Sequence, residues 1–160
     1  MSEKLNQLKE ILGEVSDLNH AASVLSWDQQ VNMPPGGGEA RGQQLATLGK
    51  LSHEKSTSDK VGKLLDDLKQ EFAGSDSDDA ALVRVAARNF DKTMHVPSEF
   101  VSEQAVVTTA AFEAWVEAKK KSDFSIFHPH LEKVFDLARK YVSFFPPSDH
   151  PYDVLLDDYE

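Results

Sequence analysis

The feature that most constrains this chain is the run Met-Pro-Pro-Gly-Gly-Gly at positions 33–38. The two prolines lack a backbone N–H and fix φ, so no helix passes through them. The glycines that follow permit backbone angles that other residues rarely adopt, and Glu39 places a negative charge in the first turn of the next helix. The sequence therefore predicts a turn over residues 26–38, with Trp27 as a core or interface anchor on its upstream side.

On both sides of this turn, apolar residues recur at spacings of three and four, the period of a helix with one buried face. In the first helix this stripe consists of Leu5, Leu8, Leu12, Val15, Ala22 and Leu25. No stretch alternates apolar and polar residues for long enough to predict a strand. The sequence thus predicts an all-α fold, a bundle of about six helices in a single segment. The expected helices cover residues 2–25, 39–55, 58–73, 77–95, 98–121 and 124–145, followed by a tail at 146–160.

Composition excludes several classes of function. With 40% hydrophobic and 28% charged residues, the 160-residue chain is typical of one globular domain. It lacks cysteine, which excludes disulfides and thiolate chemistry. The N-terminus has no apolar signal core and no run is long enough to span a bilayer, so we expect a cytoplasmic protein without a membrane partner. A net charge of −10 argues against nucleic acid. The basic run 119–121 is expected to complement the dipole at a helix C-terminus.

The chain also lacks a recognisable catalytic or metal site. Zinc hydrolysis on a helix requires His-Glu-x-x-His, because ligands four apart share one face. The closest segment, residues 53–57, has threonine in place of the second histidine. His128 and His130, near Glu132, are two positions apart, so on a helix they point in different directions. Adjacent acids such as those at 157–158 are expected on a solvated face. We therefore predict no catalytic and no metal-ligating residue here.

Several short segments nevertheless form a recognisable set. They are Ser26–Gln29, Met33–Gly37, Glu39–Arg41, Gln44–Ala46, Pro97, Asp123–Phe124, Pro129–Lys133 and Pro151–Glu160. Together they resemble the carboxypeptidase Taq family of zinc-dependent metallocarboxypeptidases. The resemblance covers nearly the whole chain, in the order in which these segments occur in the family.

This resemblance implies a mostly helical enzyme, several times longer than this chain, that removes residues one at a time from the C-termini of peptides. Zinc or another divalent metal is the cofactor of the family. Its metal ligands and the residues that hold the substrate carboxylate lie downstream of the part represented here and have no counterpart in this sequence. We therefore expect an N-terminal piece that has no cofactor of its own and is inactive alone.

The resemblance also implies a role for the predicted turn, because the N-terminal helices of the family line and cover a long substrate groove. Trp27, Asp28 and Arg41 are the expected wall residues, and they would meet a peptide substrate only in the full-length enzyme. Alternatively, the turn only packs the first helix against the second.

The expected partner is the remainder of the enzyme, or a second copy of the chain, through an apolar face that would otherwise be bare. The other class of function is a free-standing helical interaction module without peptidase activity. Such a module would have its apolar faces covered.

Overall fold

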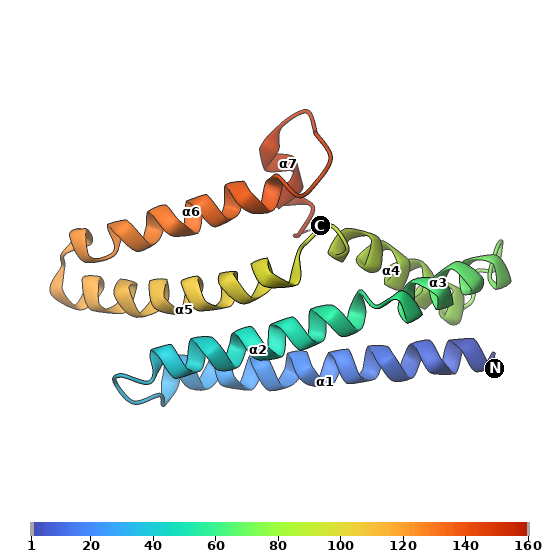
Figure 1. Ribbon diagram of the computed structural model, residues 1–160, viewed down its shortest axis with the longest axis horizontal. Helices are drawn as coiled ribbons and strands as arrows, with labels where there is room; N and C mark the ends of the chain where they lie inside the picture. The colour runs from blue at the N-terminus through green and yellow to red at the C-terminus, as the bar shows by residue number, and fades with distance from the viewer. Residues whose placement is uncertain (1, 160) are drawn as a thin grey trace.

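The computed structural model describes residues 2–159, and this part of the chain is all-α, as the sequence predicts (Figure 1). It contains seven α-helices and one short 3-10 helix, with no residue in a strand. The elements are α1 (Glu3–Val31), α2 (Gly38–Ser56), α3 (Asp59–Glu71), α4 (Asp78–Thr93), α5 (Ser98–Lys121), η1 (Phe124–Ile126), α6 (His128–Val142) and α7 (Pro151–Leu156). None of these helices is long and apolar enough to cross a membrane.

The helices form two antiparallel pairs and one arm. Helix α1 packs against α2, and α5 packs against α6 (Figure 1). The two pairs are joined by an extensive contact between α2 and α5. Helices α3 and α4 pack on each other, and α3 packs on α1; we refer to α3 and α4 as the α3–α4 arm.

Small residues allow α2 and α5 to approach closely. On the side of α2 that faces α5, they recur every three or four positions as Gly38, Gly42, Ala46 and Gly49. A Cβ atom at Gly42 would lie 3.6 Å from Thr109 and from the Cα atom of Val106. One at Gly49 would lie 3.2 Å from Val101. The spacing puts all four on one helix face, where the missing side chains leave room for the partner helix.

The molecule has two separate packing centres. The first lies under the α3–α4 arm and consists of Leu5, Leu8, Val61, Leu64, Leu65, Leu68, Val83 and Ala87. The second lies at the base of the α5–α6 pair around Phe100, the largest fully buried side chain of the described residues. The ring of Phe100 lies 5.1 Å from that of Phe144 in an edge-on arrangement and 6.0 Å from that of Tyr141. Helix α1 contributes Leu5 and Leu8 to the first centre, whereas its C-terminal half packs on α2.

The turn is shorter than predicted, because α1 continues through Val31 and residues 26–31 are helical. Nothing in this segment breaks a helix, and only the position before Pro34 is sterically excluded from it. The backbone N–H groups of Asn32 and Met33 both donate to the Asp28 carbonyl at 2.9 Å, which closes the helix. The turn therefore consists of residues 32–37. Within it, Gly36 adopts a φ of 88°, a backbone angle that favours glycine.

The C-terminal region also differs from the prediction. The helix expected over 124–145 is divided, because Pro129 is accepted only in the first turn of α6. A separate 3-10 turn precedes it, capped by Asp123, whose Oδ1 accepts from the backbone N–H of Ser125 at 3.0 Å. Helix α6 then ends at Val142, three residues earlier than expected.

The segment expected to be a tail contains α7, so that prediction is wrong over residues 151–156. Pro151 occupies its first turn, where a missing N–H costs nothing. His150 and Asp153 form a reciprocal cap. The Nδ1 atom of His150 accepts from the N–H of Tyr152 at 3.1 Å, and the Asp153 carboxylate accepts from the N–H of His150 at 2.9 Å.

Candidate functional site

Two of the three expected wall residues lie together at the α1–α2 turn. Arg41 Nη2 is 2.6 Å from Asp28 Oδ2, and Nη1 of the same guanidinium donates to the carbonyl of Leu25. Its Nε donates to Gln44 Oε1 at 3.2 Å. The Arg41 side chain is only 11% exposed. The polar atoms of this pair are thus engaged within the chain, where they hold the end of α1 against the start of α2.

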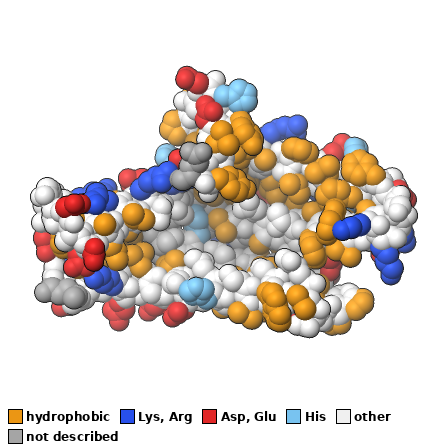
Figure 2. Space-filling view, turned by 180° about the vertical axis from the view of Figure 1, so that it is seen from behind, with side chains coloured by type: hydrophobic (Ala, Val, Ile, Leu, Met, Phe, Trp, Pro, Cys, Tyr) orange, Lys and Arg blue, Asp and Glu red, His pale blue; other side chains and the backbone are white. Residues whose placement is uncertain are grey.

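Trp27 is 59% exposed, so of the two expected roles it does not anchor the core of this chain, and its role as an interface anchor stays a prediction. Val24 and Val31 are also exposed, at spacings of three and four from Trp27, which places all three on one side of α1. We call this set the α1 stripe. Hydrophobic side chains also gather at the end of the molecule formed by the α1–α2 turn and the tip of the α5–α6 pair, on the right in Figure 2.

Trp115, the second of the two tryptophans, is exposed on α5. Its ring lies 5.9 Å from that of Phe112, and Lys119 Nζ lies 5.0 Å from the ring centre. Lys119 belongs to the basic run 119–121, which occupies the last turn of α5 as the sequence predicts. There the positive charges complement the helix dipole.

The molecule exposes more surface than a compact protein of its size. Its accessible surface is 10269 Å². A compact monomer of 17.8 kDa exposes about 8,000 Å². The excess, about 2,300 Å² on this chain alone, is larger than the roughly 800 Å² that each partner contributes to an interface of standard size. The large hydrophobic side chains exposed in this surface include the α1 stripe and Trp115.

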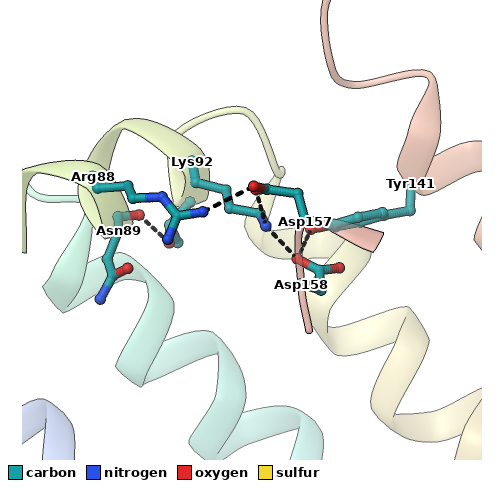
Figure 3. A network of polar contacts seen from close by, with 7 residues as sticks. Arg88, Asn89, Lys92, Tyr141, Asp157 and Asp158 are labelled. Carbon is teal, nitrogen blue, oxygen red and sulfur yellow. Dashed lines mark hydrogen bonds and ion pairs between the residues drawn. The ribbon is translucent and has the colours of Figure 1, made fainter. Parts of the chain in front are cut away.

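A polar network joins α4 to the C-terminal segment and to α6 (Figure 3). Lys92 Nζ lies 2.5 Å from Asp157 Oδ2 and 2.7 Å from Asp158 Oδ1. Arg88 Nη2 lies 2.8 Å from Asp157 Oδ1, and the Tyr141 hydroxyl donates to Asp158 Oδ1 at 3.1 Å. We call these five residues the clasp. The two aspartates were expected on a solvated face, and no local pattern reveals their partners, because Lys92 is 65 positions away.

The clasp alters the acidity of its members. Burial, followed by the neighbouring Asp158 carboxylate, raises the pKa of Tyr141 to about 12. Hydrogen bonding from Lys92 holds the pKa of Asp157 below its usual value. Burial alone would lower the pKa of Lys92, but its hydrogen bonds to Asp157 and Asp158 outweigh this, so the pKa is raised. Lys92 and Asp157 are therefore both charged at neutral pH.

The residues singled out for a hydrolytic metal centre do not come together in the part of the chain that the structure describes. Thr57, at the position where a zinc-binding helix needs its second histidine, donates its hydroxyl to the His53 carbonyl at 2.8 Å. Both ring nitrogens of His53 are buried without a hydrogen-bond partner among the described residues. His128 Nε2 lies 3.9 Å from Glu132. Across residues 2–159, no three ligand-type side chains converge.

The fold matches about a third of the length of solved carboxypeptidase structures. The crystal structure of BsuCP superposes with a TM-score of 0.92 at 28% identity, over 98% of this chain and 31% of that chain. The structure of Pyrococcus furiosus carboxypeptidase, Apo-Mg, superposes with a TM-score of 0.77 at 34% identity, over all of this chain and 32% of that chain.

A family model described as carboxypeptidase Taq (M32) metallopeptidase matches residues 7–160, and the chain belongs to this family. Thermostable carboxypeptidase 1 of Pyrococcus furiosus is 36% identical over 156 residues, which cover 96% of this chain and 31% of that protein. Carboxypeptidase 1 of Bacillus subtilis is 30% identical over 151 residues, which cover 94% of this chain and 30% of that protein. The chain thus spans about 30% of the length of these relatives and corresponds to their N-terminal portion.

Proposed function

We propose that this chain is the helical N-terminal portion of a metal-dependent carboxypeptidase that removes C-terminal residues from peptides, and that it is non-catalytic as an isolated chain. The observation that carries this proposal is the excess surface of about 2,300 Å², in a chain that spans about 30% of its relatives. The metal, zinc or another divalent cation, would be held by residues outside this sequence. The cytoplasmic location is likewise a prediction.

Within that enzyme we propose that the α1–α2 turn forms part of the wall or lid of a substrate groove. Of the three expected wall residues, Trp27 is the one whose side chain is free to meet a peptide, and Asp28 and Arg41 hold the turn in place. A wall of this kind excludes water and bulky folded substrates without supplying chemical groups. The competing proposal is that the turn only packs α1 against α2.

The alternative function, a free-standing interaction module, fits the surface less well. Such a module would be expected to cover its large apolar side chains, whereas the α1 stripe and Trp115 are exposed. The proposed partner is the remainder of the enzyme, or a second copy through the same apolar surface. Light scattering on the purified chain tests the second copy, since self-association would appear as a mass above 17.8 kDa that grows with concentration.

The decisive experiment compares the isolated chain with a chimera. In the chimera, this chain replaces the matching N-terminal segment of Bacillus subtilis carboxypeptidase 1. We expect the isolated chain to show neither stoichiometric metal nor turnover, and the chimera to release C-terminal residues from peptides. Metal-dependent turnover by the purified isolated chain would contradict the proposal that it is non-catalytic.

The wall is tested separately by Trp27→Ala in the chimera, with peptides of increasing length as substrates. We expect the preference for peptide length to change, because a large side chain is removed from the groove. Val85→Ala, which alters an exposed side chain on the α3–α4 arm, is the matched control. If Trp27→Ala loses stability but keeps the wild-type preference for peptide length, the proposal of a groove wall is refuted. The turn would then only pack α1 against α2.

A further inference from the structure

Helix α7 is only partly buried against the rest of the molecule, through Val154 and Leu155. None of its residues is buried, and Tyr152 and Leu156 are exposed. Among the other helices it packs on α6. Six residues are too few for a helix to be stable without tertiary support, so the contacts around α7 decide its position.

The clasp provides the charged part of that support. Asp157 directly follows the last residue of α7. Its Oδ1 atom forms an ion pair with Arg88 of α4, and its Oδ2 atom forms one with Lys92 of the same helix. Asp158 is held from the opposite side by the Tyr141 hydroxyl of α6 (Figure 3). Lys92, at 23% exposure, is the most enclosed charge of the clasp, so its two ion pairs are screened less than those of a freely exposed lysine.

A groove lies between α7 and the α5–α6 pair. Its volume is about 480 Å³, and its lining includes Gln104, Thr108, Leu137, Tyr141, Tyr152 and Leu155. The first four residues belong to α5 and α6, and the last two belong to α7. Helix α7 therefore forms one side of the groove, and its position determines how much of Leu137 and Tyr141 reaches solvent.

We propose that α7 is a strap over this groove, held shut by the clasp, and that loss of the clasp charges releases α7 and opens the groove. Helix α7 is joined to α6 through residues 143–150, a segment that includes two consecutive prolines and lies outside any helix. Helices α5 and α6 pack on each other, and Phe144, near the start of this connection, packs on Phe100 of α5. The residues that follow Phe144 let α7 move while this packing stays in place. The proposal concerns this chain alone and does not depend on the carboxypeptidase role.

The test is hydrogen exchange of the α7 backbone amides in the intact chain. Raising ionic strength from about 0.01 M to about 1 M shortens the screening length from about 30 Å to about 3 Å, and we expect α7 to exchange faster. Lys92→Met removes both ion pairs while keeping the alkyl chain. It should accelerate exchange in α7 by about tenfold at low salt and remove most of the salt dependence.

Arg139→Met is the matched control, because Arg139 pairs only with Asp136 on the surface of α6, outside the clasp. It should leave exchange in α7 unchanged. Unaltered protection in α3, around Leu65 and Leu68, verifies that each variant is folded. A second variant, Asp157→Asn with Asp158→Asn, should reproduce Lys92→Met and raise the fluorescence of a dye that binds apolar surface. Wild-type exchange of α7 in both clasp variants, with no response to salt, would overturn the strap.

Discussion

Arg41 Nη2 lies 2.6 Å from Asp28 Oδ2, and this ion pair closes the α1–α2 turn from its two ends. Thirteen positions separate the two residues, and the run of prolines and glycines lies between them. The same guanidinium donates to the Leu25 carbonyl. The geometry of the turn is therefore set by a side chain of α2 as well as by the backbone limits of Pro34 and Gly36.

Replacing Arg41 should destabilise the chain. Arg41→Met keeps most of the apolar stem but leaves Asp28 and the Leu25 carbonyl without their donor. Hydrogen bonds to charged groups contribute about 1.5–3 kcal/mol, so we expect a loss of about 2 kcal/mol in urea unfolding. The double variant with Asp28→Asn should lose less than the sum of the two single variants. Additive losses would mean that the two side chains act independently.

The packing centre under the α3–α4 arm should be sensitive to truncation. Leu68 is fully buried there, and Leu68→Ala should cost about 2–5 kcal/mol, since a cavity remains. The control is Val85→Ala on the same arm, where the side chain is exposed and the change should stay within about 0.5 kcal/mol. Equal losses at the two positions, measured by chemical denaturation, would argue against the packing described here.

Two glycines should respond to substitution in opposite directions. Gly42 faces α5 at contact distance, so Gly42→Leu should force the helices apart and cost about 1–3 kcal/mol. Gly13 lies on an open side of α1, with nothing within 4 Å of the position of a Cβ atom. Gly13→Ala should therefore stabilise the chain by up to about 1 kcal/mol through helix propensity. Melting temperatures that move in the same direction for both variants would contradict the assignment of the two faces.

Tyr141 should ionise late in an alkaline titration. Its folded-state pKa of about 12 lies above the ordinary value of 10, so its contribution to stability is complete below pH 10. The contribution is lost as the pH rises from about 10 to about 12, because the unfolded chain then ionises first. Absorbance of tyrosinate should show a late step that Tyr141→Phe removes. A titration curve that keeps this step in the variant would assign it to another residue.

Asp157 should make the clasp sensitive to acid. Its pKa is lowered in the folded state, so its contribution is present above the unfolded value of about 4 and is lost as the pH falls through the folded value. Melting temperatures between pH 7 and pH 3 should fall more steeply for the wild type than for Asp157→Asn. Identical slopes would mean that the carboxylate contributes nothing to folding.

Local patterns predict the helices well and their ends less well. Apolar spacing locates the first six α-helices, and α5 has the predicted bounds because Pro97 and the lysine run mark both ends. The extension of α1 to Val31 was missed because the prolines suggest a longer turn than they require. Helix α7 was missed because six residues carry too little periodicity, although Pro151 and Asp153 are start signals.

The site could be predicted only in part. Asp28 and Arg41 were singled out together and do lie in contact, but as partners of each other. Trp27 was expected to be a core or interface anchor because large aromatic residues usually bury their rings. Its ring is exposed in this chain, which excludes the core and leaves the interface as a prediction. The clasp depends on contacts 65 and 69 positions apart in sequence, which no local pattern records.

Helix α1 takes part in the core under the α3–α4 arm at one end and carries Trp27 near the other. Its 29 residues make a rod about 43 Å long. A rod of that length acts as a lever, so a tilt of about 5° at the arm moves the far end by about 4 Å. A change in the packing centre under the α3–α4 arm that tilts α1 would therefore also displace the α1–α2 turn, about 40 Å away along the helix.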